Sequence, residues 1–287
     1  MLDILKNTEN INIIDKKLVL TGTCNQRYIE PTRAFLNSIV KNSPTINVLI
    51  RLVNVDNETI EQLKEVYKNC NIFFCIDNTE LCDERKIINQ TEIVNRTISE
   101  LKRKTNSDFK GIGWLYSEEA AYCSNIKYNT INQLLKNDVK CVVYMDVDTI
   151  VRKDIYDIYK TVLEYDIAMY ISPDEHLKEI TQYGEKYFGW HAGIIIGSNT
   201  DISIDFFKDV ELRVNGNLYD IEADEDEFDH VFYKEKYNKQ IKLNQLTEYY
   251  KDNGPKFNTK NAVWSGQTSA KICNNDYINE YFKYKDV

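Results

Sequence analysis

The sequence predicts an α/β fold in which a mixed, mostly parallel sheet is flanked by helices. Three apolar runs of strand length, at residues 17–23, 47–55 and 71–76, alternate with segments whose apolar residues recur at helical spacing. Such alternation is typical of parallel strands joined by crossover helices. Of the 287 residues, 43% are hydrophobic, and no internal repeat or low-complexity linker divides them. We therefore expect a single domain over residues 1–287.

Two helices are expected between the first three strands. Residues 31–42 predict the first helix, with Pro31 at the opening position, where its missing N–H would have no partner in any case. Residues 56–69 predict the second, because Asp56 or Asn57 can cap a helix with its side-chain oxygen. Helical connections of this length suit parallel neighbours.

The middle of the chain combines an ambiguous segment with a clear helix. Residues 78–113 are polar, and they are expected to hold one helix around residues 92–104. Residues 117–137 predict a single long helix, which Ser117 caps and whose early glutamates favour its positive N-terminal end. A further apolar run follows at residues 141–151 and predicts the next strand.

Composition excludes some classes of partner and compartment. The net charge of −9 and the pI of about 5.1 argue against a wide basic surface, so we expect no nucleic-acid partner. The N-terminus lacks the basic start and apolar run of a signal peptide, and no stretch approaches 18 apolar residues. The seven cysteines are scattered without a CxxC pair. We therefore expect a cytoplasmic protein with reduced thiols and no transmembrane segment.

The segment CVVYMDVDTIV, residues 141–151, places two aspartates inside an apolar run. Side chains two residues apart on an extended chain project to the same side, so Asp146 and Asp148 would lie together. Ligands of open α/β sheets bind at the carboxyl ends of the strands. Two adjacent carboxylates repel each other, and a divalent cation relieves that repulsion by accepting their oxygens as ligands. The pair therefore predicts a metal site.

A simpler interpretation of this segment is open at this point. The strand could stop at Met145, which would leave Asp146 and Asp148 as solvated residues of a turn. The apolar residues Ile150 and Val151 favour the metal site, because they keep the segment at least partly buried.

Residues 141–155 resemble the DxD segment of the GT-A nucleotide-diphospho-sugar transferases, with glycosyltransferase families eight and seventy-seven as the nearest. Five further blocks resemble, in the same order, the first strand and helix, the lysine-containing helix under the donor, the strand beside the sugar, the acidic helix and the C-terminal Gly–Lys loop of these enzymes. These blocks are residues 18–39, 127–140, 187–199, 222–233 and 261–271. The resemblance spans most of the chain and implies a GT-A fold, which is Rossmann-like.

The resemblance implies a metal-dependent glycosyltransferase of the hexosyltransferase class. Residues 18–148 are then the expected nucleotide-binding half, and residues 149–287 the expected sugar and acceptor half. The implied donor is a nucleotide-diphosphate sugar, with UDP as the expected nucleotide, and the implied acceptor is a hydroxyl of a glycan, protein or lipid. Mn²⁺ or Mg²⁺ on Asp146 and Asp148 would bridge the two phosphates of the donor. Transfer is expected to retain the anomeric configuration.

The same resemblance implies roles for individual residues. Those expected to contact the nucleotide and its diphosphate are Thr21, Gly22, Tyr28, Lys127, Asp146, Gly266 and Lys271. Those expected at the reacting sugar or the acceptor are His191, Asp226 and Glu227. Independently of the resemblance, Trp190 and Trp264 are expected to form a stacking surface for a sugar ring, because aromatic faces match the apolar faces of carbohydrates. Simpler structural roles stay open: a turn for Gly22, a core or surface position for Tyr28, a solvated helix face for Lys127, a core position for His191 and both tryptophans, and a solvated helix start for the acidic run.

Two other functions compete with sugar transfer. The motif DVDTI also resembles the DxDx[TV] nucleophile motif of haloacid-dehalogenase phosphatases, although Ile150 stands where Thr or Val belongs and the motif lies far from the first strand. The other hypothesis is a non-catalytic GT-A-like protein that binds a sugar nucleotide or a glycan. It is retained because Val263 stands where family eight has a histidine as third metal ligand.

Overall fold

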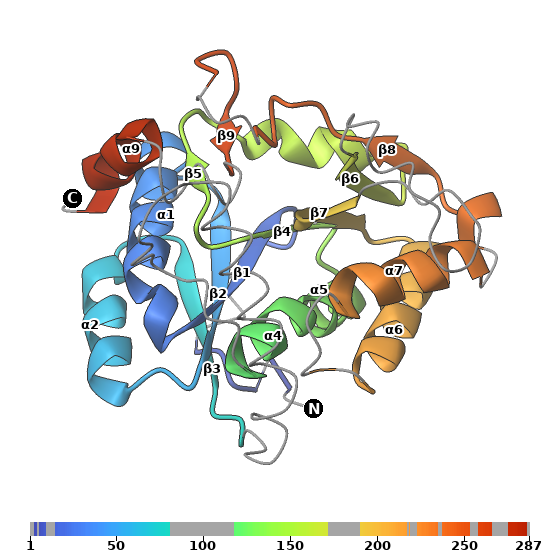
Figure 1. The fold of residues 1–287 in the computed structure, drawn as a ribbon, viewed down its shortest axis with the longest axis horizontal. Coiled ribbons are helices and arrows are strands. Elements are labelled where there is room, and N and C mark those ends of the chain that lie inside the picture. Colours follow the sequence, from blue (N-terminus) through green and yellow to red (C-terminus); the bar gives the residue numbers. More distant parts are fainter. Residues whose placement is uncertain are drawn as a thin grey trace, which may run out of the picture.

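The computed structural model describes residues 3–4, 6–9, 15–80, 118–171, 190–216, 218, 223–234, 237–252, 258–265 and 275–285. Its main sheet has seven strands in the order β3-β2-β1-β4-β7-β6-β8 (Figure 1). Their bounds are Val19–Asn25 (β1), Asn47–Val53 (β2), Ile72–Asp77 (β3), Cys141–Met145 (β4), Ile167–Ile171 (β6), Trp190–Ser198 (β7) and Leu243–Gln245 (β8). A separate antiparallel pair joins β5 (Ile150–Val151) to β9 (Val263–Trp264).

Four strands at one side of the sheet run parallel, as the sequence predicts. β1 pairs in parallel with both β2 and β4, and β2 pairs in parallel with β3. β7 then runs antiparallel between β4 and β6, while β8 is parallel to β6. The predicted mixed, mostly parallel sheet is therefore confirmed. Strands from before and after the DxD segment belong to this one sheet.

Helices cover both faces of the sheet (Figure 1). One side carries α1 (Ile29–Asn42), α2 (Asn57–Tyr67) and α9 (Asn275–Lys285), and the other carries α4 (Glu118–Asn125), α5 (Lys127–Lys136), α6 (Asp201–Val214) and α7 (Ala223–Lys234). The short 3-10 helices are η2 (Gln26–Tyr28), η4 (Tyr156–Val162) and η6 (Tyr237–Lys239). α1 and α2 pack on one buried apolar cluster, and α5, α6 and α7 pack on another. Leu36 and Leu63 belong to the first cluster, whereas Leu134 and Phe206 belong to the second.

The first two helices lie close to their predicted positions. α1 begins at Ile29, so Pro31 is its third residue and not its first. The Asp56 cap of α2 is confirmed, because its side chain accepts a 2.7 Å hydrogen bond from the Thr59 N–H. The Thr59 hydroxyl also donates to the same carboxylate, over 3.0 Å.

The single helix predicted over residues 117–137 is wrong. Ile126 separates α4 from α5, and its ψ of −7° departs from the helical value of about −42°. Backbone hydrogen bonds continue across the break, from the Ile126 N–H to the Tyr122 carbonyl over 2.9 Å and from the Thr130 N–H to the Ile126 carbonyl over 3.3 Å. Ser117 and the helix predicted around residues 92–104 lie outside the described part of the chain.

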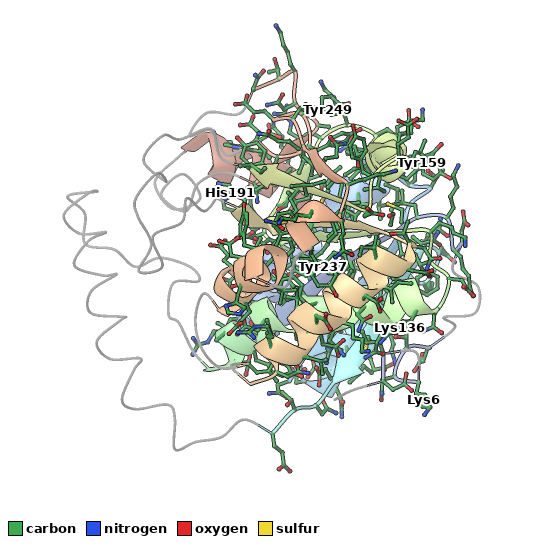
Figure 2. All side chains as sticks on the ribbon, turned by 90° about the vertical axis from the view of Figure 1, so that its right-hand side faces the viewer. Lys6, Lys136, Tyr159, His191, Tyr237 and Tyr249 are labelled. Atoms are coloured by element: carbon green, nitrogen blue, oxygen red, sulfur yellow. The ribbon has the colours of Figure 1, made fainter. Side chains whose placement is uncertain are left out.

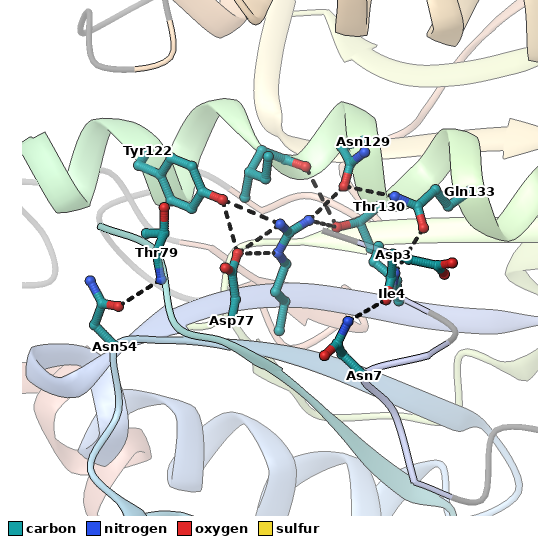
Figure 3. A network of polar contacts seen from close by, with 12 residues as sticks. Asp3, Ile4, Asn7, Asn54, Asp77, Thr79, Tyr122, Asn129, Thr130 and Gln133 are labelled. Carbon is teal, nitrogen blue, oxygen red and sulfur yellow. Dashed lines mark hydrogen bonds and ion pairs between the residues drawn. The ribbon is translucent and has the colours of Figure 1, made fainter. Parts of the chain in front are cut away.

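An arginine in β2 ties the sheet to α4 and α5 (Figure 3). Arg51 is fully buried, and its guanidinium donates to Asp77 Oδ2 at the end of β3 over 2.7 Å. It also donates to the Asn129 side chain on α5 over 2.7 Å and to the Tyr122 hydroxyl on α4 over 3.3 Å. A buried charge is tolerated only when it is paired and hydrogen-bonded, as here. The network therefore fixes the first turn of α5 against the sheet.

The described part of the chain contains free cysteines, as predicted from their scattered positions. Five cysteines of the described part form no disulfide there: Cys24, Cys70, Cys75, Cys123 and Cys141. Burial raises the pKa of Cys24 to about 12 and that of Cys75 to about 11, so neither is an active thiolate at neutral pH. Among the helices described, none has the length and apolar character that crossing a bilayer requires.

Candidate active site

The DxD segment follows β4 at the carboxyl end of the parallel strands. β4 ends at Met145, and the N–H of Thr149 donates to the carbonyl of Asp146 over 3.1 Å, which closes a turn. Asp146 and Asp148 are half-buried, whereas Val147 and Thr149 are buried. The strand therefore does stop at Met145, as the simpler interpretation expected. The aspartates are nevertheless not the solvated residues of that interpretation.

A glycine of β7 lies against the first aspartate. The N–H of Asp146 donates to the carbonyl of Gly193 over 3.0 Å, which continues the β4–β7 pairing beyond β4. A Cβ on Gly193 would lie 2.5 Å from Asp146 Oδ2 and 2.4 Å from Lys251 Nζ. The missing side chain thus leaves room for a carboxylate and an ammonium group. Lys251 is 4% exposed, so protein encloses this ammonium.

The preceding residue of β7, Ala192, contacts a second buried ammonium. Lys127 Nζ, at the start of α5, donates to the carbonyl of Ala192 over 3.1 Å and to Asp224 Oδ2 over 2.6 Å. Burial lowers the pKa of Lys127, but the charges of Asp224 and Asp146 outweigh burial and raise that pKa above 10.5. Lys127 is therefore positively charged at neutral pH. The solvated-helix alternative for it is wrong, because the residue is 1% exposed.

Two carboxylates of α7 lie beside the same strand. Asp224 accepts hydrogen bonds from Lys127 and, over 3.0 Å, from the hydroxyl of Ser124 on α4. Glu225 Oε1 accepts the N–H of Ala192 over 3.4 Å, and this glutamate is exposed. The first turn of α7 therefore presents one buried and one accessible carboxylate to β7.

The residues of this acidic run that were predicted to contact the sugar or the acceptor are Asp226 and Glu227. Glu227 Oε2 instead accepts a hydrogen bond from Arg213 Nε of α6 over 2.6 Å, so its carboxylate contacts another helix. Successive residues turn by about 100° around a helix, which puts Glu227 about 200° from Glu225. Asp226 belongs to α7, but its side chain lies outside the described part. Asp224 and Glu225, which were not predicted, thus lie beside β7, and the roles of Asp226 and Glu227 at the sugar stay predictions.

His191 stands next to Ala192 on β7 and is half-buried. Its ring lies 5.5 Å from the Tyr170 ring of β6, with 44° between the ring planes. Figure 2 shows His191 and Lys136, the last residue of α5, on opposite sides of the molecule, so α5 reaches the site with its N-terminal end. Trp264 is fully buried in β9, which confirms the core alternative for this tryptophan. The Trp190 side chain lies outside the described part.

The residues predicted to contact the nucleotide base lie in β1 and η2. Thr21 is fully buried within β1. Gly22 packs against the DxD segment so closely that a Cβ would lie 2.7 Å from Val147 Cγ1 and 2.9 Å from the Met145 carbonyl oxygen. Close packing within a strand, and not a turn, therefore explains this glycine. Tyr28 is half-buried at the end of η2 and packs on the first apolar cluster.

Some predicted residues cannot be placed, and some residues of the site escaped prediction. Gly266 and Lys271 lie outside the described part. Asp224 and Glu225 belong to the acidic run already singled out, but only their contacts with Lys127 and Ala192 distinguish them from the rest of that run. Lys251 lies in the segment EYYKDN, which carries no recognisable motif. Only its contact with residues far away in the sequence reveals its position.

The ligand atoms at the DxD segment fit a hard divalent cation. Asp146 and Asp148 supply carboxylate oxygens, which Mg²⁺ and Mn²⁺ prefer. Together with Asp224 and Glu225 they outnumber the two buried ammonium groups, which leaves an excess of negative charge. Within the described ranges, no group of three or more His, Cys, Asp or Glu side chains could hold a metal ion. A cation held by these two aspartates would leave coordination positions for water or for oxygens of a bound ligand.

The chain resembles several solved glycosyltransferase structures in fold. The bifunctional glycosyltransferase WbbM has a TM-score of 0.57 and 15% identity, over 96% of this chain and 50% of WbbM. GlyE of Streptococcus pneumoniae TIGR4 has a TM-score of 0.54 and 11% identity, over 95% of this chain and 61% of GlyE. An active-site mutant of LgtC has a TM-score of 0.51 and 13% identity, over 94% of this chain and 97% of LgtC. The chain thus spans about half the length of WbbM and less than two thirds of GlyE.

The family model for glycosyl transferase family 8 matches residues 19–199, which is more than half the chain. No curated protein matches the sequence. The match includes β1, the DxD segment and the strand that carries Ala192 and Gly193. It favours an enzyme over a non-catalytic binding protein, and a transferase over a haloacid-dehalogenase phosphatase. The chain belongs to glycosyl transferase family 8 and has a GT-A fold.

Proposed function

We propose that the protein transfers a sugar from a UDP-sugar to an acceptor hydroxyl, with a divalent cation and with retention of the anomeric configuration. One observation carries the proposal: Asp146 of the DxD segment meets two buried lysines around Ala192 and Gly193. Carboxylates that hold a cation, together with fixed positive charge, are what a departing diphosphate requires. UDP as the nucleotide and retention as the outcome are supported by the resemblance to family eight.

The chain's own residues would mainly position the substrates and balance charge. Asp146 and Asp148 would hold Mn²⁺ or Mg²⁺, which supplies Lewis acidity to the leaving diphosphate when it is bound. Lys127 keeps its proton at neutral pH and holds the Asp224 carboxylate in place. Glu225 offers an accessible carboxylate that can accept a hydrogen bond from a sugar hydroxyl. His191 on the adjacent strand position is suited to contact the donor sugar or the acceptor.

Hydrolysis of sugar nucleotides tests this function without knowledge of the acceptor. Wild-type protein would be incubated with a panel of UDP-, GDP-, ADP- and CDP-sugars and Mn²⁺, and release of the nucleoside diphosphate would be followed by ion-exchange chromatography. We expect slow release from one UDP-sugar, and its loss in EDTA. The same UDP-sugar, or UDP, should raise the melting temperature in Mn²⁺, because a ligand that binds only the folded state stabilises it.

Two variants separate the site from general effects of charge. Asp146→Asn should abolish both hydrolysis and stabilisation, because it removes an oxygen ligand of the cation. Asp205→Asn changes the charge by the same amount on the exposed side of α6 and should leave both unchanged. If no nucleoside diphosphate stabilises the protein with any metal, the proposed function is wrong. When an acceptor is found, the proton NMR coupling of the new glycosidic bond reports retention or inversion.

A further inference from the structure

Lys251 occupies an unusual place for a lysine. Its ammonium and the Asp146 carboxylate each lie within 2.5 Å of one point, the position of a Cβ on Gly193, so Nζ and Oδ2 are at most 5 Å apart. The residue is 4% exposed. Burying an ammonium is costly unless nearby negative charge compensates for it. The charge of Lys251 therefore affects the free energy with which Asp146 binds a cation.

The backbone around Lys251 is anchored beside the DxD turn. The N–H of Asp252 donates to the carbonyl of Val263 over 3.0 Å, and the N–H of Ser265 donates to the carbonyl of Asp252 over 3.0 Å. The Asp252 carboxylate also accepts the N–H of Asn258 over 2.8 Å. β9, to which this segment is bonded, pairs with β5 immediately after the DxD turn. The position of Lys251 is therefore built into the fold and is not that of a surface side chain resting on the site.

We propose that Lys251 makes cation binding at Asp146 conditional on the diphosphate. This inference rests on the proposed function and concerns the same site. A divalent cation that approaches Asp146 alone meets the fixed positive charge of Lys251 and is disfavoured. A diphosphate brings negative charge that offsets both positive groups, so the cation and the diphosphate bind together. The expected donor is thus the metal–nucleotide complex, and free Mn²⁺ binds weakly.

Coulomb's law gives the size of the effect. A single and a double positive charge about 5 Å apart, screened as in water, change an affinity by roughly tenfold, and a lower effective dielectric increases the factor. We therefore expect Lys251→Met to bind Mn²⁺ alone about tenfold or more tightly than wild type. The same variant should bind UDP in Mn²⁺ more weakly, because one positive partner of the diphosphate is gone. The coupling between Mn²⁺ and UDP should fall accordingly.

The test measures binding, not turnover. Free Mn²⁺ would be titrated by electron paramagnetic resonance and UDP by calorimetry, with and without Mn²⁺, in wild type and variants. Lys251→Arg keeps the charge and should keep the weak binding of free Mn²⁺. Lys260→Met removes a lysine that is exposed near the same C-terminal segment, and it should match wild type. If Lys251→Met does not fold, Lys251→Gln takes its place, because it also removes the charge, and the same gain in affinity for free Mn²⁺ is expected.

The outcomes separate this inference from the proposed function. Absence of Mn²⁺ and UDP binding in wild type would overturn the proposed function itself, and the inference with it. Binding of both, with no coupling in wild type, would overturn only the inference. The same holds if Lys251→Met and Lys260→Met bind free Mn²⁺ equally. Tighter Mn²⁺ binding in Lys251→Met, reversed in Lys251→Arg, would establish the role of this charge.

Discussion

Gly193→Ala is the most informative single change, because it adds one carbon between two charged groups. The new Cβ would lie 2.4 Å from Lys251 Nζ and 2.5 Å from Asp146 Oδ2. An ordinary contact of 3.4 Å would require Nζ to move by about 1.0 Å and Oδ2 by about 0.9 Å. Both atoms are ends of flexible side chains, so the backbone of β7 need not move. The substitution should therefore disturb the site and leave the sheet intact.

Gly193→Ala should lower the rate of donor hydrolysis strongly and change the free energy of unfolding little. Displacement of reacting or binding groups by about 1 Å can cost on the order of 100-fold in rate. The free energy of unfolding should change by less than about 1 kcal/mol, because Gly→Ala also restricts the unfolded chain by about 0.4–1 kcal/mol. We therefore expect a loss of donor hydrolysis of about 100-fold with a nearly unchanged urea midpoint.

Gly197→Ala on the same strand is the matched control. Its Cβ would lie 2.6 Å from Phe207 Cε2 and 3.1 Å from Leu135 Cδ1, inside the second apolar cluster. Overpacking of this kind costs about 1–3 kcal/mol. Urea denaturation and hydrolysis of the UDP-sugar would be measured for both variants. The reasoning is refuted if Gly193→Ala keeps full hydrolysis, or if it loses as much stability as Gly197→Ala.

Three further predictions concern charged residues. Asp148→Asn removes one of two repelling carboxylates. In EDTA its free energy of unfolding should therefore equal that of wild type or exceed it by up to ~1 kcal/mol. Mn²⁺ with UDP should then no longer raise its melting temperature, and a variant melting well below wild type in EDTA would show a structural role. Asp77→Ala leaves Arg51 as an uncompensated buried charge and should lower the free energy of unfolding by about 3–5 kcal/mol, measured in urea; a loss below about 1 kcal/mol would contradict that pairing. The pKa of Lys127 is raised above its unfolded value of 10.5. The charged Lys127 therefore adds to the free energy of unfolding below pH 10.5, and this stabilisation is lost as pH rises through the folded-state pKa. Melting temperatures measured against pH should show this decline in wild type and not in Lys127→Met. The prediction is wrong if the two proteins give the same pH profile of melting temperature.

Local sequence patterns were sufficient for the first three strands, for the cap of α2 and for the centre of the site. The positions of β1, β2 and β3 follow from apolar runs, and the cap of α2 follows from Asp56, because these features depend on neighbours in the chain. The aspartates of the DxD segment were identified for the same reason. Their charge interrupts an apolar run, and that interruption is visible without any tertiary contact.

The helix break and the acidic helix show the limits of local pattern. Residues 117–137 have continuous helical spacing, and nothing in that spacing marks Ile126 as the point where α4 ends. The Arg51 network on α4 and α5 exists only once β2, β3 and these helices are packed. Similarly, the acidic run fixed the location of α7 but not which of its carboxylates faces β7.

The sequence by itself therefore determined the α/β class, the sheet of mostly parallel strands and the two aspartates that define the candidate metal site. Only the tertiary structure decided what surrounds them. Lys251 reaches Asp146 because β9 pairs with β5, and Asp224 reaches Lys127 because α7 packs beside β7. These residues are about 100 positions apart in the chain, and hydrophobic periodicity carries no information at that distance. Long-range strand pairing and the burial of opposite charges brought them together.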